Sequence, residues 1–382
     1  MALREKLPKY TAFGVAGSAM IETQVEAVAT TEDLSVMGVT EVLARVPALR
    51  MLESRLLSWV DKMQPSFAVL IDNPGFNLRL AEQLKLRGVT VFQYVAPKVW
   101  AWGEGRVARL KRDIDMILGI LPFEEEFFKS RGVNYVYVGS PLKDRINKII
   151  IRRETLGLSP TRPIIACLPG SRPSEIALNL PTLVGVRDMV SKELPDALFV
   201  VPIAPNISID LVDQTLRSRF GMGLTPYQPG KLGDLQVESW TCGGLRFVRG
   251  MSLEMMAIAD AAVVASGTAT LECALLGTPM VVVYTMSSLS YEIAKRVVKL
   301  PYVSLVNLIF GRKVVQEYIQ EFSLADVGAE VLSLLRDQER RQDLDFLFGD
   351  LRDKLPGFAA STAADIIARA VTSPGGASSR SI

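Results

Sequence analysis

The turn sequence CLPGSR at 167–172 carries the residue types that hold a phosphate or diphosphate group. It follows an apolar run and precedes a helical pattern that begins near Ser174. Gly170 allows the backbone to approach a ligand closely, and Ser171 completes the turn. The free amides at the helix start favour an anion, and the guanidinium of Arg172 matches a diphosphate. The alternative is an ordinary turn between a strand and a helix, with a surface arginine.

The sequence ASGTATLE at 265–272 repeats this arrangement. Ser266 and Thr268 supply hydroxyl groups on either side of Gly267. Glu272 lies one turn into the expected helix, where it could accept hydrogen bonds from ribose hydroxyls; otherwise it is a solvated helix residue. Two such turns in one half of the chain are more informative than either alone, because both open at the carboxyl ends of parallel strands, where ligands bind.

A candidate base lies in IDNPGFN at 71–77. The chain contains no histidine, so a general base must be a carboxylate or, less readily, a lysine, tyrosine or cysteine. Asp72 closes a strand-like run, and Pro74 and Gly75 turn the chain after it. A carboxylate at this end of a strand points into the crevice between domains, so Asp72 is the candidate base. The alternative is a turn residue whose side chain binds its own backbone.

Two further segments leave their role open. In YVAPKVWAWGEGR at 94–106, two tryptophans beside two glycines suit a sugar or acyl surface, or else fill the core. Around SLVNLIFGR at 304–312, the polar residues Asn307, Glu317 and Gln320 stand in an apolar stretch. Each is either a satisfied buried group or a ligand contact.

The composition excludes several classes of protein. The 382 residues are 49% hydrophobic and 22% charged, with a net charge of +2, which gives no electrostatic argument for nucleic-acid binding. Three widely spaced cysteines fit neither a zinc site nor a disulfide framework and favour a reducing compartment. No metal or cofactor is expected. No run is long and apolar enough to span a membrane. The apolar segment 36–60, with regularly spaced arginines, is either an interfacial lipid-contacting helix or a buried amphipathic one.

Short apolar runs alternate with longer helical patterns, which predicts an α/β protein with parallel sheets covered on both faces. A basic stretch at 143–162 separates two halves. We therefore expect domains at 1–150 and 151–323, a helical tail at 324–371 and disorder at 372–382. The ten expected strands span 11–15, 67–72, 89–94, 116–121, 135–138, 163–168, 197–203, 245–248, 261–265 and 280–284.

The segments described above, considered together, resemble those of the lipid-A-disaccharide synthases, and the resemblance runs from about residue 11 to residue 320. The segments that carry the resemblance are FGVAGSAM, LSVMGVTEVL, IDNPGFN, VWAW, LPFEEEFF, LPGSRPSEI, ASGTATLECALLGTPMVVVY and SLVNLIFGR. The resemblance implies two Rossmann-like doubly wound domains of the B-type glycosyltransferase architecture, with the active site between them. It also implies an inverting transfer, without a metal, at the cytoplasmic face of a membrane.

The implied reaction condenses UDP-2,3-diacylglucosamine with 2,3-diacylglucosamine 1-phosphate. The resemblance assigns Arg172 and its loop to the UDP diphosphate, and Glu272 to the ribose. Asn307, Glu317 and Gln320 match positions near the nucleotide, and Asp72 matches the aspartate that would deprotonate the acceptor 6-hydroxyl. The implied location is the cytoplasm, peripheral to the inner membrane, or an organelle for a eukaryotic source. A homodimer with an exchanged tail is one assembly to expect.

The chain also departs from the family pattern. The family opens with a strand and a glycine-rich loop that have no counterpart here, which leads to the hypothesis of a truncated or spliced form. Loss of that strand would leave its neighbours unpaired. Ser140 stands where the family has a histidine, and Gly75 where many members have aspartate. Two alternatives stay open: an impaired, nucleotide-binding form of the same enzyme, and a UDP-sugar epimerase, which the missing histidine disfavours.

Overall fold

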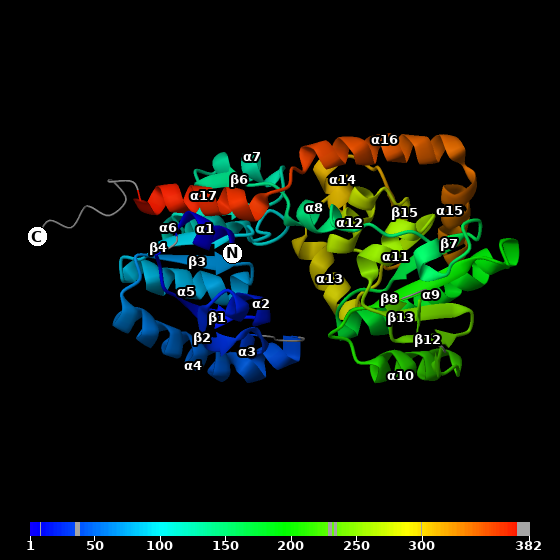
Figure 1. The fold of residues 1–382 in the computed structure, drawn as a ribbon, viewed down its shortest axis with the longest axis horizontal. Coiled ribbons are helices and arrows are strands. Elements are labelled where there is room, and N and C mark those ends of the chain that lie inside the picture. The colour runs from blue at the N-terminus through cyan, green and yellow to red at the C-terminus, as the bar shows by residue number, and fades with distance from the viewer. Residues whose placement is uncertain (8, 35–38, 228–230, 233–234, 299, 373–382) are drawn as a thin grey trace, which may run out of the picture. The chain divides into compact units, whose positions relative to one another are not determined.

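The computed structural model describes residues 1–382 except 8, 35–38, 228–230, 233–234, 299 and 373–382 (Figure 1). The chain forms two compact units. Unit 1 comprises Met1–Pro141 and the residues from Gly357 onward, and unit 2 comprises Leu142–Pro356. The segment expected as a helical tail consists of α15 (Leu324–Arg336) and α16 (Gln338–Lys354) in unit 2 and α17 (Ala359–Thr372) in unit 1. The disorder expected at the C-terminus falls, from residue 373 on, outside the described residues.

Unit 2 is built on an eight-stranded sheet. From one edge its strands are β16 (Gln316–Ile319), β15 (Met280–Tyr284), β14 (Ala261–Ala265), β7 (Ile164–Leu168), β8 (Leu198–Ile203), β13 (Leu245–Arg249), β12 (Ser239–Cys242) and β9 (Thr225–Pro226). All pairings from β16 to β13 are parallel, and β12 and β9 continue the sheet antiparallel. The short strands β10 (Lys231–Leu232) and β11 (Leu235–Gln236) form a separate antiparallel pair. The order of the six parallel strands is that of a doubly wound Rossmann sheet.

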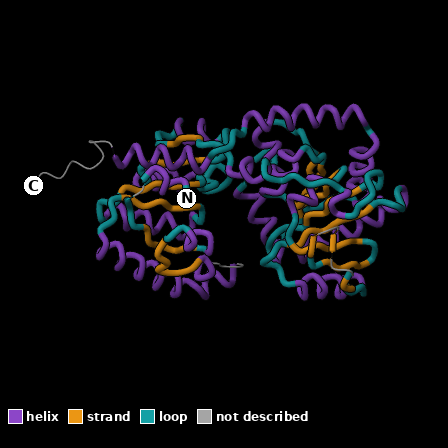
Figure 2. The backbone as a smooth tube through the Cα atoms, viewed as in Figure 1, coloured by secondary structure: helices purple, strands orange, loops and turns teal. Residues whose placement is uncertain are grey.

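Helices cover both faces of this sheet (Figure 2). On one face α9 (Pro173–Glu193) packs against α10 (Ile209–Phe220) and α15. On the other, α12 (Thr268–Leu276) packs against α11 (Ser252–Ile258), α14 (Leu305–Phe310) and α16. The remaining elements of unit 2 are α13 (Ser288–Val297) and the 3-10 turn Glu154–Leu156. Because both faces are covered, β7, β8 and β14 consist entirely of buried residues.

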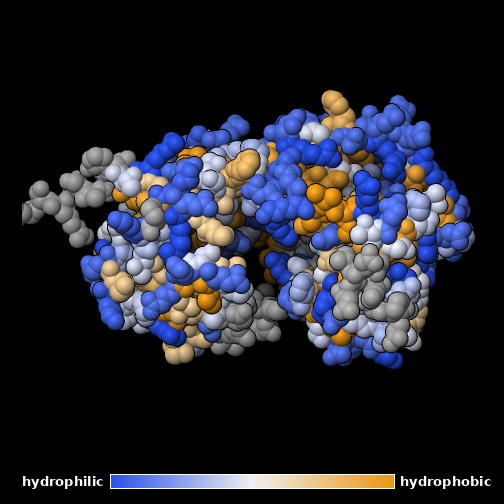
Figure 3. Space-filling view, viewed as in Figure 1, coloured by the Kyte–Doolittle hydropathy of each residue, from blue (hydrophilic) through white to orange (hydrophobic). Residues whose placement is uncertain are grey.

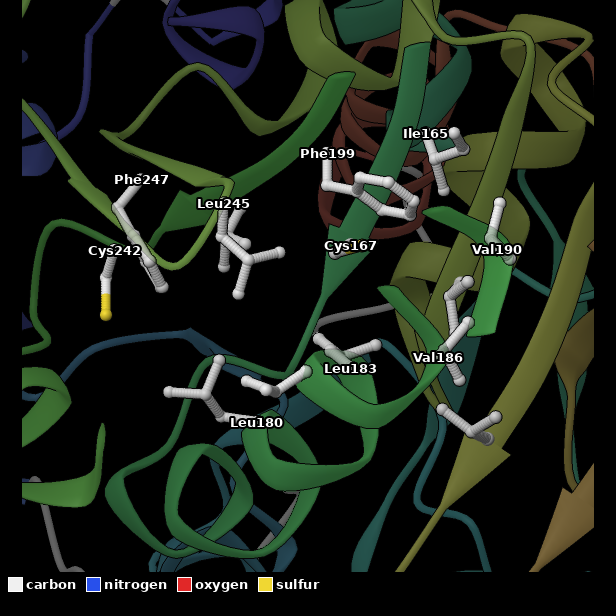
Figure 4. Packing of buried hydrophobic residues seen from close by; sticks show 14 of the residues in the cluster. Ile165, Cys167, Leu180, Leu183, Val186, Val190, Phe199, Cys242, Leu245 and Phe247 are labelled. Carbon is white, nitrogen blue, oxygen red and sulfur yellow. The ribbon is translucent and has the colours of Figure 1, made fainter. Parts of the chain in front are cut away.

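The core of unit 2 forms where alternate strand residues meet the apolar stripe of α9. Ile165 and Phe199 contribute from the sheet, and Leu183 and Val190 from the helix, all fully or almost fully buried (Figure 4). Residues two apart in a strand share a face, which is why Ile165 and Cys167 belong to this cluster while Ile164 and Ala166 face the other side. This packing fixes the strand ends from which the candidate turns emerge.

Unit 1 contains two separate parallel sheets. One has the order β3 (Phe67–Ile71), β4 (Thr90–Tyr94), β5 (Met116–Gly119) and β6 (Tyr135–Tyr137). The other pairs β1 (Ala12–Ala16) with β2 (Val25–Thr30), and no ladder joins β1 to β3 in the part of the chain that the structure describes. The helices are α1 (Ala2–Lys6), α2 (Ser18–Glu22), α3 (Thr31–Leu34), α4 (Val39–Met63), α5 (Pro74–Leu86), α6 (Val107–Asp113) and α7 (Glu124–Lys129), with a 3-10 turn at Glu104–Arg106. The short α8 (Pro141–Ile146) begins where unit 1 ends.

The C-terminal helix α17 completes unit 1. Its residues Ala359, Ala363 and Ile367 pack against Phe92 and Leu118 of the four-stranded sheet. Lys6 of α1 and Asp365 of α17 form an ion pair of 2.8 Å. The start and the end of the described chain therefore lie against the same sheet.

Two expectations about the elements can be compared with this fold. All ten expected strands are present, with ends within two residues of those predicted. For segment 36–60, the described side chains favour the buried helix, because Leu52, Leu56 and Val60 of α4 are buried in the core at a helical spacing. The side chains of residues 34–45 are outside the described set. No helix among the described residues has the length and apolar character needed to cross a membrane.

Candidate functional site

The two predicted nucleotide turns emerge side by side at the carboxyl edge of the sheet in unit 2. Strands β7 and β14 are direct neighbours, with Val264 opposite Leu168 at their ends. The chain leaves β7 toward β8 on one side and leaves β14 toward β15 on the other. This reversal of direction is the topological switch point at which doubly wound sheets bind ligands. The structure therefore brings 169–172 and 266–268 together.

The turn after β7 is closed by Glu175. Gly170 has φ of +116°, and a Cβ atom there would lie 2.5 Å from Glu175 Oε2, so the position requires glycine. The amides of Ser171 and Arg172 donate to this oxygen, at 2.9 and 3.2 Å. The prediction that these amides are free for an anion is therefore wrong for these two. Glu175 Oε1 holds the guanidinium of Arg172 at 3.0 Å, while the Arg172 side chain remains 75% exposed.

Two residues that the sequence argument missed complete this corner. The buried Asn179 donates from Nδ2 to the Glu175 carbonyl (3.0 Å) and accepts at Oδ1 from the Thr285 amide (2.8 Å). It thus joins α9 to the loop after β15. Burial raises the pKa of Tyr284, the charge of Glu175 raises it further, and that of Arg172 lowers it. The sequence argument also missed Glu175, although a signal for it was available: a glutamate three positions after Arg172 has the spacing of a helix capping box.

The turn after β14 has a different character. Gly267 has φ of +129°, and Ser266 Oγ donates to the Val303 carbonyl at 3.2 Å, while Thr268 is exposed. Glu272 is not a solvated residue, because only 12% of its side chain is exposed. Burial raises its pKa, and the charge of Arg145, 3.8 Å away, offsets part of that effect. Glu272 is thus a largely buried carboxylate one turn beyond the switch point.

Asn307 and Glu317 form a closed hydrogen-bond network. Asn307 is fully buried, and its Oδ1 accepts from the amides of Val314 and Val315 at 2.7 and 2.9 Å. Its Nδ2 donates to Glu317 Oε1 at 2.8 Å and to the Val315 carbonyl at 2.9 Å. Glu317 in turn accepts from the amides of Val303 and Ser304, both at 2.9 Å. The polar atoms of Asn307 are therefore fully engaged inside the protein.

The side-chain amide of Gln320 also bonds to backbone groups, in this case those of the loop that contains Met286. Its Oε1 accepts from the Met286 amide at 3.0 Å, and its Nε2 donates to the Met286 carbonyl at 3.1 Å. The three polar residues around β16 thus hold the loops that contain Met286 and Val303. Because Val303 also accepts from Ser266, the network reaches the switch point.

In unit 1, Asp72 directly follows β3 and its side chain is exposed. Both Asp72 and Asn73 have left-handed backbones, with φ of +48° and +38°, and the Asp72 amide donates to the Tyr94 carbonyl at 3.0 Å. Two consecutive left-handed residues other than glycine mark a turn that the surrounding structure must impose. Asp72 belongs to unit 1, whereas the other ten predicted site residues belong to unit 2.

The two tryptophans after β4 differ in their environments. Trp100 is half-buried, lies edge-on to Phe123 at 4.8 Å, and donates from Nε1 to Glu124 at 2.8 Å. Trp102 is 44% exposed, with the Arg106 guanidinium 4.4 Å from its ring centre. Trp100 is thus part of the core, and Trp102 is available to a ligand.

Two further observations bear on the chemistry of the site. Ser140, which stands in place of the histidine of the resembled family, is 1% exposed. Across the residues that the structure describes, no group of three or more Cys, Asp and Glu side chains is arranged to hold a metal ion.

Comparison with known structures gives the class of fold first. A UDP-GlcNAc 2-epimerase from Neisseria meningitidis, bound to UDP-GlcNAc, superimposes with a TM-score of 0.58 at 10% identity over 96% of this chain and 89% of that one. The architecture is that of the B-type glycosyltransferases and the epimerases that share their fold. At this level of identity the likeness concerns the fold alone.

Sequence relationships then define the family. A family model described as lipid-A-disaccharide synthetase matches residues 1–219 and 239–371. A lipid-A-disaccharide synthase of Myxococcus xanthus is 39% identical over 368 residues, covering 95% of this chain and 90% of that protein. One from an Anaeromyxobacter species is 40% identical over 343 residues, covering 89% and 84%. The chain belongs to the lipid-A-disaccharide synthase family of glycosyltransferases. This membership disfavours the alternative that the protein is a UDP-sugar epimerase.

Proposed function

We propose that this protein transfers diacylglucosamine from UDP-2,3-diacylglucosamine to 2,3-diacylglucosamine 1-phosphate. The observation that carries the proposal is the pairing of β7 with β14, because it puts both glycine turns at the switch point of the unit 2 sheet. Family membership supplies the reaction class.

On the donor side, Arg172 binds the diphosphate. Its exposed head and its ion pair with Glu175 support this role, since the carboxylate orients the guanidinium before the ligand arrives. Ser266, Gly267 and Thr268 line the adjacent turn, and Glu272 accepts from the ribose hydroxyls. Asn307, Glu317 and Gln320 contribute by holding the loops that flank these turns.

On the acceptor side, Asp72 is the general base. It removes the proton from the acceptor 6-hydroxyl as that oxygen attacks the anomeric carbon, the bond to UDP breaks, and the configuration inverts. Charge develops on the departing diphosphate, where Arg172 stabilises it in the transition state. The exposed carboxylate and its unusual backbone support this assignment.

Since both proposed substrates carry acyl chains, we propose that the reaction takes place at a membrane surface, and the family resemblance implies its cytoplasmic face. Helix α13 supports a peripheral attachment, because Leu289, Ile293 and Val297 are 74%, 54% and 46% exposed at a spacing of four residues. Apolar side chains also reach the surface of both units on the face drawn in Figure 3. A homodimer remains a prediction.

The test is turnover by the purified protein in detergent, with UDP affinity measured separately by calorimetry. We expect Asp72→Asn to lower kcat about 10²- to 10⁴-fold while UDP still binds, as for loss of a general base. Arg172→Ala should weaken UDP binding about tenfold to 150-fold, the range for one charge-assisted contact. Arg219→Ala, at an exposed arginine of α10, is the matched control.

The outcomes separate two candidate functions. Disaccharide formed by the unsubstituted protein and lost in Asp72→Asn supports the transferase. The second candidate is nucleotide binding without turnover. The observation that favours it is that, among the described residues of unit 1, no ladder joins β1 to β3. UDP binding that depends on Arg172, with no product formed, would decide for that candidate.

A further inference from the structure

One buried amide contacts two of the strained residues around the proposed base. Gln93 lies in β4, next to β3, and its side chain is 0% exposed. Its Nε2 lies 3.2 Å from the carbonyl of Asp72 and 3.1 Å from that of Val95, with the Tyr94 carbonyl at 3.4 Å. Asp72 and Val95 both have left-handed backbones, with φ of +48° and +68°. For a β-branched residue such as Val95, this conformation is rare.

A second amide supports the same turn from the helix that follows it. Asn77 of α5 is 7% exposed, and its Nδ2 lies 2.7 Å from the Asp72 carbonyl and 3.1 Å from that of Ile71. The Asp72 carbonyl therefore accepts from two buried side chains, one from β4 and one from α5. A conformation that is costly by itself is held in place by these donors.

Gln93 is poorly suited to a role in stability alone. Its Oε1 is buried and has no hydrogen-bond partner among the described residues. Leaving a buried acceptor unpaired is unfavourable, and an apolar side chain of similar size would avoid that cost. What an apolar side chain cannot supply is the Nε2 donor that reaches Asp72 and Val95 together.

We propose that Gln93 is a positioning residue for the proposed base: its amide fixes the Asp72 backbone and couples it to the loop that begins at Val95. This inference rests on the proposed function of Asp72. The direction of the Asp72 carboxylate follows from its backbone, and a misplacement of about 1 Å can cost about 10²-fold in rate. The loop that Gln93 couples to Asp72 also carries the exposed Trp102.

The experiment compares Gln93→Leu with Val91→Ala in the full chain. Val91 is a matched control because it is fully buried, belongs to the same strand and faces the same side, but its side chain has no amide that could donate to the turn. We expect Gln93→Leu to lower kcat about 10²-fold, with an unchanged affinity for UDP. Val91→Ala should lose stability but keep its kcat.

A second background tests whether Gln93 acts through Asp72. In Asp72→Asn, the residual rate should not fall further on Gln93→Leu, because the group being positioned is already lost. Equal losses in both backgrounds, or a loss in Val91→Ala that matches Gln93→Leu, would overturn the inference. Gln93→Glu adds a pH readout: it retains a donor only when protonated, so its kcat should fall with rising pH where that of the unsubstituted protein does not.

Failure of the proposed function is a separate result. If the unsubstituted protein forms no disaccharide, hydrogen exchange of the hydrogen-bonded amides of Asp72 and Asn77 decides the structural part of the inference. Faster exchange in Gln93→Leu than in Val91→Ala supports the positioning role. Equal exchange in the two variants contradicts it.

Discussion

The buried carboxyl group of Glu124 predicts a pH-dependent stability of unit 1. Glu124 is 1% exposed, its Oε1 accepts from Trp100 Nε1 at 2.8 Å, and its Oε2 lies 3.0 Å from the Tyr135 hydroxyl. Burial raises its pKa from 4.5 to about 7, against the opposing effect of these hydrogen bonds. The perturbation we consider is Glu124→Gln, which keeps the shape and the hydrogen bonds but cannot ionise.

The direction of the effect follows from proton linkage. The folded protein holds the proton more tightly than the unfolded chain, so the stabilisation from protonated Glu124 is fully present below pH 4.5 and is lost as the pH rises to about 7. Each pKa unit corresponds to about 1.4 kcal/mol, so the difference between the pKa of Glu124 in the folded and unfolded protein amounts to about 3 kcal/mol of stability. Relative to the unsubstituted protein, Glu124→Gln should therefore become more stable by about 3 kcal/mol between pH 4 and pH 8.

Urea unfolding followed by tryptophan fluorescence measures this difference. Three of the four tryptophans lie in unit 1, so Trp240→Phe in both proteins makes the signal specific for that unit. Glu126→Gln, at an exposed position of the same helix, is the control. The difference in free energy of unfolding between Glu126→Gln and the unsubstituted protein should not change with pH, because an exposed carboxylate contributes little to stability.

Two results would refute the reasoning. If the free energies of unfolding of Glu124→Gln and the unsubstituted protein differ by the same amount from pH 4 to pH 8, then burial does not hold the proton on this group. If Glu124→Gln is the less stable protein at pH 8, then an ionised Glu124 is stabilised by Trp100 and Tyr135 more than it is penalised by burial. Either result would require a different account of how the loop carrying Trp100 is held.

Two further predictions concern unit 2. Asn307→Leu leaves the amides of Val314 and Val315 unpaired. At roughly 1–3 kcal/mol for each of these two groups, and about 2–4 °C for each kcal/mol in a unit of this size, we expect calorimetry to show a transition about 4–24 °C lower. A shift below about 2 °C would count against the network. Leu289→Ser combined with Ile293→Ser should reduce flotation with vesicles of phosphatidylglycerol and phosphatidylethanolamine, because each apolar side chain contributes about 1.5–3 kcal/mol when buried. Leu86→Ser, at a leucine 75% exposed on α5, is the control, and equal flotation of the two variants would exclude α13 as the contact.

Strands covered on both faces could be predicted because their sequences are continuous apolar runs. Ala261–Ala265 and Met280–Tyr284 were predicted to the residue. The strands that were missed lack such runs. Gln316–Ile319 is the edge strand of its sheet and is only partly buried throughout, so no strand was predicted there, and Glu317 was interpreted as a candidate site residue instead. Val25–Thr30 carries Glu26 and is half exposed because it, too, is an edge strand: in the part of the chain that the structure describes, its sheet consists of β1 and β2.

The glycine turns were also predictable, because only glycine tolerates the backbone that Gly170 and Gly267 adopt. The side chains that contact these turns could not be predicted. The partner of the Ser171 and Arg172 amides is Glu175, and Asn179 contacts a loop that lies 106 residues further along the chain. Contacts of this kind depend on which strands become neighbours, and a single sequence gives the strands without their order.

The polar residues selected from the sequence divide by burial into two kinds, with different consequences. Arg172, Thr268 and Asp72 are exposed and free to exchange water for a ligand. Asn307 and Gln320 already use their side-chain atoms to hold backbone. An amide of the second kind, fully buried in Asn307 and partly buried in Gln320, cannot bind a ligand without giving up these bonds. Substitution of such a residue therefore acts through the position of a loop, whereas substitution of an exposed residue acts on the ligand directly, and only the former should also lower the stability of its unit.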